Sequence, residues 1–222
     1  MGTITGQQIV DRARRILQDT TSGGTRWLDA EMLDWINDAQ REIVLLKPNS
    51  FSSVEDLALV AGTKQTLPAE GLLLLTVVRN VNGKAVRRVD RNILDSENPD
   101  WHTATPGNTV EHYIFDEDAP DTFWVYPPQS GTPGDVEVIF SKAPTDLASL
   151  VSVITLNDIY MNVILDYVLY RAYSKDTDYA GNVQRASNHY NGFNNSLGVK
   201  TQVEFSSSPN QNISTARAAG SS

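Results

Sequence analysis

The residues best suited to chemistry are few in this chain, and their spacing does not form a recognisable catalytic or metal site. The three histidines, His102, His112 and His189, are too scattered to share a metal ion or to pair with a nucleophile. We expect structural roles for them, with His112 in a strand and His189 on a helix surface. Cysteine is absent, which excludes disulfides, thiolate zinc sites and cysteine nucleophiles. The sequence therefore predicts no catalytic residue, no metal ligand and no cofactor.

Three other stretches resemble functional motifs only in part. The acidic run at residues 116–121 lacks the alternating carboxylates and the glycine of a calcium loop, so a hairpin loop between two strands is the simpler interpretation. Residues 61–64 (AGTK) lack the first glycine and the following helix of a phosphate-binding loop. Trp101, Trp124 and residues 126–128 (YPP) could form a platform for a sugar or a polyproline segment. We interpret them instead as core and rim residues of a sheet.

The element that organises the chain is the segment at residues 156–176, the most continuously apolar run in the sequence. A helix over this run is apolar on nearly all sides, so it must be buried on nearly all sides and forms the central core helix. We expect a capping box from Thr155 to Asp158 to open it. The run is too short and too interrupted for a membrane span. Its polar residues recur every four positions and form one narrow stripe, namely Asp158, Asn162, Asp166, Tyr170 and Ser174.

Three further helices are predicted around this one. Thr5 and Gln8 form a capping box that opens the first helix, and the second runs from an N-cap at Asp29 to Pro48. The loop between them is short, so they should form an antiparallel hairpin. Their apolar stripes are Ile9, Ala13, Ile16 and Leu17 in the first, and Met32, Ile36, Ala39, Ile43 and Leu46 in the second. Apolar residues at 183, 186, 190, 193 and 197 predict a fourth helix after the central one.

In the middle of the chain, the spacing of apolar residues changes from the helical period of 3.6 toward the period of two that is typical of strands. Asn82-Gly83 lies between runs at residues 72–81 and 85–89 and is a strong hairpin signal. Three more strands are expected at residues 110–115, 123–126 and 136–141. The fold class is therefore α+β. A four-helix bundle-like α domain, residues 1–50 and 150–199, carries an inserted small antiparallel β domain, residues 51–149, and is followed by an extended C-terminal arm, residues 200–222.

This C-terminal segment is polar and low in complexity, so it cannot bury enough apolar surface to fold alone. It is either a disordered end or an arm that orders against a partner. Ordering it costs about 1–2 kcal/mol of backbone entropy per residue, so a bound arm needs a large receiving surface.

The formal net charge of −9 makes the chain a poor phosphate binder, because sequence-independent affinity for nucleic acid comes from clustered Lys and Arg. An acidic surface suits a channel that must not retain DNA. The first ten residues, MGTITGQQIV, contain neither the basic nor the apolar region of a signal peptide. We expect a protein that is made and used in a cytoplasm. A helical scaffold with an inserted sheet and a polar tail suggests a component of an assembly.

Four stretches, taken in their order along the chain, resemble the tailed-phage head-to-tail adaptor proteins, the family that includes the tail tubular protein A of short-tailed phages. The stretches are the second helix with Arg26-Trp27, Glu31, Leu33, Trp35-Ile36-Asn37, Ala39-Gln40 and Glu42-Ile43, then residues 98–101 (NPDW), residues 123–128 (FWVYPP) and residues 166–176 (DYVLYRAYSKD). Together they cover the chain to about residue 200, and their order is more specific than any one of them.

This resemblance implies a structural virion protein without enzymatic activity, located in the neck or tail and made in the host cytoplasm. Such adaptors form a ring, commonly of twelve copies, beneath the portal, and DNA passes through the ring without sequence-specific binding. The implied partners are the portal protein, a tail or nozzle protein and further copies of this chain, with no membrane. Two other functions stay open: another neck or head-completion protein of the same stack, and a tail carbohydrate-binding or carbohydrate-processing module that uses Trp101, Trp124 and the carboxylates of residues 116–121.

The resemblance also implies where contacts would lie. The family's C-terminal segment extends onto the portal or a neighbouring subunit without a fixed motif that would map single residues. We expect the partner contact of this chain at Val203, Phe205, Ile213 and Arg217. In a ring, the polar stripe of the central helix would line a subunit contact or the channel through Asp158, Asn162 and Asp166.

Overall fold

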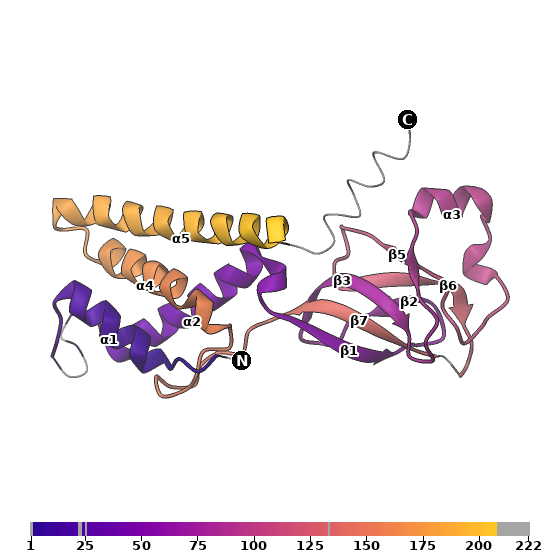
Figure 1. The fold of residues 1–222 in the computed structure, drawn as a ribbon, viewed down its shortest axis with the longest axis horizontal. Helices are drawn as coiled ribbons and strands as arrows, with labels where there is room; N and C mark the ends of the chain where they lie inside the picture. The colour runs from indigo at the N-terminus through magenta and orange to yellow at the C-terminus, as the bar shows by residue number, and fades with distance from the viewer. Residues whose placement is uncertain (1, 22–23, 25, 133, 208–222) are drawn as a thin grey trace. The chain divides into compact units, whose positions relative to one another are not determined.

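The computed structural model describes residues 2–21, 24, 26–132 and 134–207 (Figure 1). The chain forms two compact units, each with its own core. The helical unit consists of Met1–Lys47 and Pro144–Ser222, and the sheet unit consists of Pro48–Ala143. The α+β fold class predicted from the sequence is confirmed.

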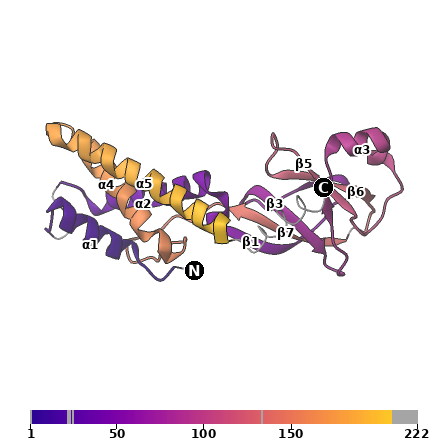
Figure 2. The same ribbon diagram turned by 45° about the horizontal axis from the view of Figure 1, so that its top comes forward.

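The helical unit is built around the predicted central helix. Its helices are α1 (Gly6–Leu17), α2 (Asp29–Leu46), α4 (Met161–Lys175) and α5 (Ala180–Ser207), and the short 3-10 helix η3 (Asp158–Tyr160) precedes α4. Helix α4 packs against α1, α2 and α5 and lies between them in both views (Figures 1 and 2). Eight of its residues are buried: Met161, Val163, Ile164, Tyr167, Val168, Leu169, Ala172 and Tyr173.

The start of this helix differs from the sequence prediction. The capping box from Thr155 to Asp158 does not form, because both residues are used elsewhere. The Thr155 amide donates to Gln40 Oε1 at 2.7 Å, and the Asp158 carboxylate accepts hydrogen bonds from the N-terminal segment. Asn157 takes the cap position instead, since its side chain accepts a hydrogen bond from the Ile159 amide at 3.1 Å.

The two N-terminal helices begin close to where the sequence places them. The capping box of Thr5 and Gln8 is confirmed by both of its hydrogen bonds. Asp29 is the first residue of α2 and not its N-cap, because Leu28 holds that position and its amide donates to Glu31 Oε2 at 3.2 Å. The Asp29 carboxylate instead pairs with Arg14 of α1, which ties the two helices together.

Helix α5 continues through Lys200 as far as Ser207. Val203 and Phe205 therefore lie on a helix, whereas Ile213 and Arg217 lie outside the residues that the structure describes. The helix is held by Phe193 and Leu197, which are buried, and Phe193 packs against Tyr167 of α4 with 5.3 Å between the ring centroids.

The sheet unit contains two small sheets. The first has the order β1-β7-β3 and the second β2-β6-β5-β4. All their pairings are antiparallel except that of β4 with β5. The strands are β1 (Ser52–Ala58), β2 (Gly62–Thr66), β3 (Gly71–Asn80), β4 (Arg87–Arg88), β5 (His112–Phe115), β6 (Thr122–Gln129) and β7 (Asp135–Lys142), with helix α3 (Arg91–Glu97) and the 3-10 helices η1 (Pro48–Ser50) and η2 (Trp101–Thr103).

Apolar side chains from both sheets form the core of this unit, among them Leu74, Val77, Phe123, Val138 and Phe140. The three predicted strands after residue 110 are confirmed as β5, β6 and β7.

The turn at Asn82-Gly83 is also confirmed. Gly83 has a φ of 102°, and the Asn80 amide donates to the Lys84 carbonyl at 2.7 Å. The return arm differs from a regular hairpin. It makes one bridge to β3, between Arg79 and Ala85, and then β4 joins the second sheet in a parallel pair with β5.

Candidate functional site

Asp158 is the first residue of the predicted polar stripe, and it anchors the N-terminal segment. Its carboxylate accepts hydrogen bonds from the Thr3 hydroxyl and the Thr3 amide, both at 2.7 Å, and from the Ile4 amide at 3.1 Å. These bonds, the Thr3 hydroxyl first, hold the pKa of Asp158 below its ordinary value. The side chain therefore has partners within its own chain.

Asp166 also has a partner within the chain. Its Oδ1 lies 3.0 Å from His189 Nδ1 on α5, and both side chains are partly exposed. The His189 ring stacks on Tyr173 with 5.7 Å between centroids. The sequence placed both residues on helices but gave no indication of this pair, because residues that are 23 positions apart on two helices have no spacing rule to connect them.

Asn162 is the exposed member of this set, and it lines a groove beside α5. We call this the α5 groove. It has a cavity volume of about 420 Å³ and is formed by Ile159, Asn162, Val163, Asn195, Ser196, Val199 and Lys200. Ile159 and Val199 are both exposed aliphatic side chains of the groove. Val203, a predicted partner-contact residue, is exposed one helical turn after Val199. Of the predicted contact residues, Asn162 thus lines the groove, and Val203 lies one turn beyond Val199 on α5.

A second hollow lies where α5 meets the end of α2. It is lined by Leu46, Asn194, Leu197, Gly198, Thr201 and Gln202. Leu45 and Leu46, the last two residues of α2, are both exposed. Exposed aliphatic side chains of α2, η3 and α5 therefore flank the C-terminal half of α5, and clusters of this kind on a soluble protein mark interaction surfaces.

A buried cation holds this part of α5 in place. The Lys47 side chain is 3% exposed, and its ammonium lies 2.5 Å from Glu204 Oε1 on α5, in a geometry that makes an ion pair without a hydrogen bond. Lys47 and Lys200 both lie over the Tyr160 ring, at 5.7 and 5.3 Å from its centroid. The sequence gave no indication of this cluster, because its residues come from three elements far apart in the chain.

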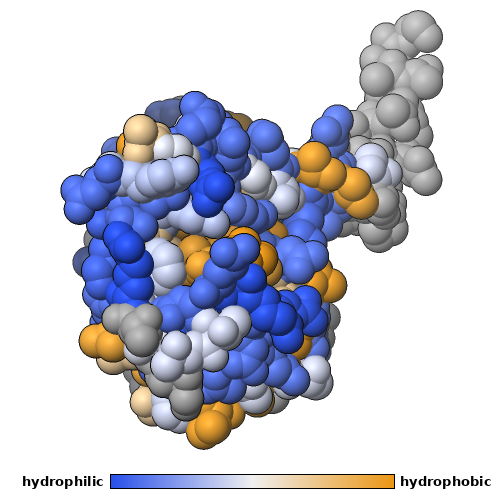
Figure 3. All heavy atoms as spheres, turned by 90° about the vertical axis from the view of Figure 1, so that its left-hand side faces the viewer, coloured by the Kyte–Doolittle hydropathy of each residue, from blue (hydrophilic) through white to orange (hydrophobic). Residues whose placement is uncertain are grey.

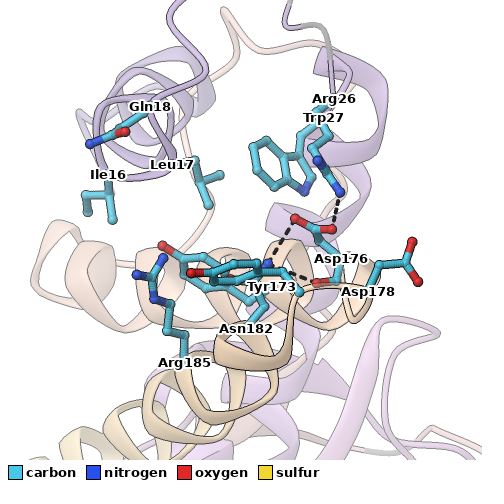
Figure 4. Close-up of a pocket in the computed structure, with 11 residues that line it drawn as sticks. Ile16, Leu17, Gln18, Arg26, Trp27, Tyr173, Asp176, Asp178, Asn182 and Arg185 are labelled. Carbon is cyan, nitrogen blue, oxygen red and sulfur yellow. Dashed lines mark hydrogen bonds and ion pairs between the residues drawn. The ribbon is translucent and has the colours of Figure 1, made fainter.

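Another hollow of the helical unit lies at its other end, where the α1–α2 and α4–α5 connections meet (Figure 4). Its volume is about 680 Å³. Three of its polar side chains bind each other, since Asp176 pairs with Arg26 and accepts a hydrogen bond from Asn182 Nδ2 at 2.9 Å. Trp27 Nε1 donates to the Ala172 carbonyl of α4 at 3.1 Å. The surface at this end is mainly hydrophilic with scattered apolar side chains (Figure 3). This network joins the α1–α2 connection to the end of α4 and to the α4–α5 connection, so its role is structural.

The aromatic residues of the sheet unit are engaged in packing. Trp101 is buried, stacks on His102 and donates from Nε1 to Asp95 Oδ1 at 2.8 Å. Trp124 is half-buried beneath the Arg91 guanidinium. The acidic run at residues 116–121 joins the antiparallel strands β5 and β6, as the hairpin-loop interpretation predicted.

Among the residues that the structure describes, no group of histidine, aspartate and glutamate side chains is placed to hold a metal ion. None of the helices there combines the length and the apolar character needed to cross a membrane.

Comparison with known proteins identifies the family. No match was found among curated proteins. The family model described as SU10 adaptor protein matches residues 4–215, a range that includes the whole sheet unit and nearly all of the helical unit. The resemblance to phage adaptors seen in the sequence is thus confirmed at the level of the family. The chain belongs to the SU10 adaptor protein family and is a phage adaptor-type structural protein of the virion neck.

Proposed function

We propose that this protein is the head-to-tail adaptor subunit of a tailed phage, and that its copies form a ring between the portal and the tail through which DNA passes. The observation that carries the proposal is the family match over residues 4–215, because it includes both compact units and not one shared module. By the resemblance to the tail tubular protein A of short-tailed phages, the ring has twelve copies, and its neighbours are the portal protein and a tail or nozzle protein.

The helical unit supplies a surface for such contacts. The α5 groove and the neighbouring α2 end expose Leu45, Leu46, Ile159, Val199 and Val203 around one helix. Packing these side chains against a partner would remove apolar surface from water, which is the main favourable term in protein association. We assign this surface to the contact with the portal or with the neighbouring subunit. Asn162 lies within it, and Asp158 and Asp166 flank it from the same helical segment.

The residues that follow α5 in the chain include two further predicted contact residues. Val203 lies one turn from the α5 groove, and the chain proceeds through Phe205 toward Ile213 and Arg217. We propose that residues 208–222 extend the contact onto the portal. The net charge of −9 is consistent with DNA sliding through the ring, since a basic wall would bind the phosphates.

The proposal is tested by mixing the full chain with the portal protein, and separately with the tail proteins, of the same virus and imaging both products by electron microscopy. We expect a complex in which this protein forms a ring on one face of the portal. A complex with the tail proteins but not with the portal would assign it to another level of the neck. Absence of both ring and complex would overturn the proposal. A monomer in the absence of the portal does not contradict it, because the portal can template assembly.

A further inference from the structure

Strand β3 has an irregular pairing that repeats along its length. Ten residues of β3 run beside residues 136–142 of β7, and the register shifts between Gly71 and Leu73, between Leu74 and Thr76, and between Val77 and Arg79. Each shift skips one residue, so β3 carries three successive bulges. Bulges re-aim side chains and are built features of a sheet.

The skipped residues are all aliphatic, and all are exposed. Leu72 is 47% exposed, and Leu75 and Val78 are each 36% exposed. Val81 continues the spacing of three and is 38% exposed. A regular strand would turn alternate residues toward the core, where apolar side chains gain most from burial. The bulges instead leave a row of aliphatic side chains on the outside, while Leu74 and Val77 fill the core. We call these four exposed residues the β3 row.

The opposite edge of the same sheet also exposes aliphatic side chains. The sheet order β1-β7-β3 makes β1 and β3 its two edge strands. On β1 and just after it, Val54 and Val60 are 60% and 59% exposed. Exposed aliphatic side chains therefore lie at both edges of one three-stranded sheet, and we call Val54 and Val60 the β1 edge.

The charges at these two edges have opposite signs. The charges of Arg79 on β3 and Glu55 on β1 are already paired within the chain, with Glu137 and Lys142. Exposed charges near the two edges are Arg87 and Arg88 on β4, a strand of the second sheet that contacts β3, and Asp56 on β1. The exposed charges beside the aliphatic side chains therefore have opposite signs at the two edges and would attract each other between copies.

We propose that the β3 row of one copy packs against the β1 edge of the next copy, so that the sheet units form a head-to-tail contact around the assembly. A closed ring of identical subunits requires two different and complementary patches on each chain, whereas a foreign partner requires only one. The inference rests on the ring proposed above and names the surface through which the sheet units meet.

The test uses two variants of the full chain that each remove one patch. Leu75→Asp with Val78→Asp removes the β3 row, and Val54→Asp with Val60→Asp removes the β1 edge. All four positions are exposed, so thermal unfolding should stay near that of the wild type; if aspartate impairs folding, serine at the same positions repeats the test. The matched control is Ile93→Asp, an exposed aliphatic on α3 of the same unit, outside both edges.

Each variant is mixed with the portal protein, and the assembled mass is measured by sedimentation and mass photometry. We expect the wild type and the control to form full rings and each edge variant alone to form none. An equal mixture of the two edge variants should join copies only in pairs and should form no closed ring, because one intact edge remains on each copy.

Rings from either edge variant would overturn this inference and leave the proposed function intact. Failure of the wild type to form rings would overturn both.

Discussion

The ion pair between Lys47 and Glu204 gives a sharp test of how α5 is held, through the substitution Glu204→Gln. The Lys47 side chain is 3% exposed and loses most of its hydration on folding, whereas Glu204 is 46% exposed and keeps part of its own. Breaking a fully buried pair costs about 3–5 kcal/mol, and an exposed pair contributes about 0–1 kcal/mol. This half-buried pair lies between them, so we expect Glu204→Gln to lower the free energy of unfolding by about 2 kcal/mol.

For a chain of 222 residues, that loss corresponds to a decrease in Tm of about 4–8 °C. The assay is thermal and urea unfolding followed by far-ultraviolet circular dichroism, which reports mainly on the helical unit. The control is Asp34→Asn, an exposed carboxylate on α2, which should change the free energy of unfolding by less than about 0.5 kcal/mol.

A double-mutant cycle with Lys47→Met separates the pair from other effects. Methionine fills a similar volume without a buried charge, so Lys47→Met alone should be tolerated. In that background, Glu204→Gln should cost less than about 0.5 kcal/mol, because the carboxylate has no buried ammonium left to compensate. If Glu204→Gln is as harmless in the wild type as in the Lys47→Met background, the pair does not stabilise α5 and the reasoning is refuted.

Three further predictions follow from single contacts. Phe193→Ala should cost about 3–5 kcal/mol in urea unfolding, because the side chain is fully buried; a cost below about 1 kcal/mol would contradict that packing. The fold lowers the pKa of Asp158, chiefly through the Thr3 hydroxyl. The Asp158 carboxylate therefore stabilises the fold above its unfolded pKa, and this stabilisation is lost as the pH falls through its folded pKa. In Asp158→Asn, the free energy of unfolding should decrease less steeply with falling pH than in the wild type. A chain ending after Ser207 should keep the wild-type Tm and lose binding to the portal in a pull-down, whereas one ending after Lys200 should also lose several degrees of Tm, because Glu204 is removed.

The helices of this protein could be predicted from the sequence because their signals are local. Residues that recur every three to four positions along one helix face, and the capping box of Thr5 and Gln8, are properties of short segments. Helices α1, α2, α4 and α5 lie where these signals predict them. The strands from β3 onward were also located, and so was the turn at Asn82-Gly83. What the sequence could not supply was the pairing of strands distant in the chain, such as β4 with β5 or the three bulges of β3 against β7. The run LLLLTVV in β3 has no period that distinguishes a buried residue from an exposed one.

The site was harder to predict than the fold for the same reason. The stripe through Asp158, Asn162 and Asp166 was recognised because it repeats every four residues, yet the partners of two of these residues come from the N-terminus and from α5. A polar stripe on a core helix therefore does not by itself mark an outward surface, since a long-range partner can bind it.

In this protein, exposed aliphatic side chains indicate contact surfaces more specifically than exposed carboxylates do. A carboxylate on the surface costs nothing to leave in water, so its exposure needs no further partner. An exposed row of leucines and valines differs from a surface carboxylate, because contact with water does not stabilise it. In β3 this row also depends on bulges that turn the side chains outward. The β3 row, the β1 edge and the α5 groove are three such places, and they lie on both compact units. If both units contribute to one ring, replacing the exposed aliphatic residues of either unit by polar residues should reduce ring assembly. The Tm of the unassembled chain should stay near its wild-type value. A large decrease in Tm would mean that the aliphatic residues stabilise the fold itself and would remove the reason to regard them as contacts.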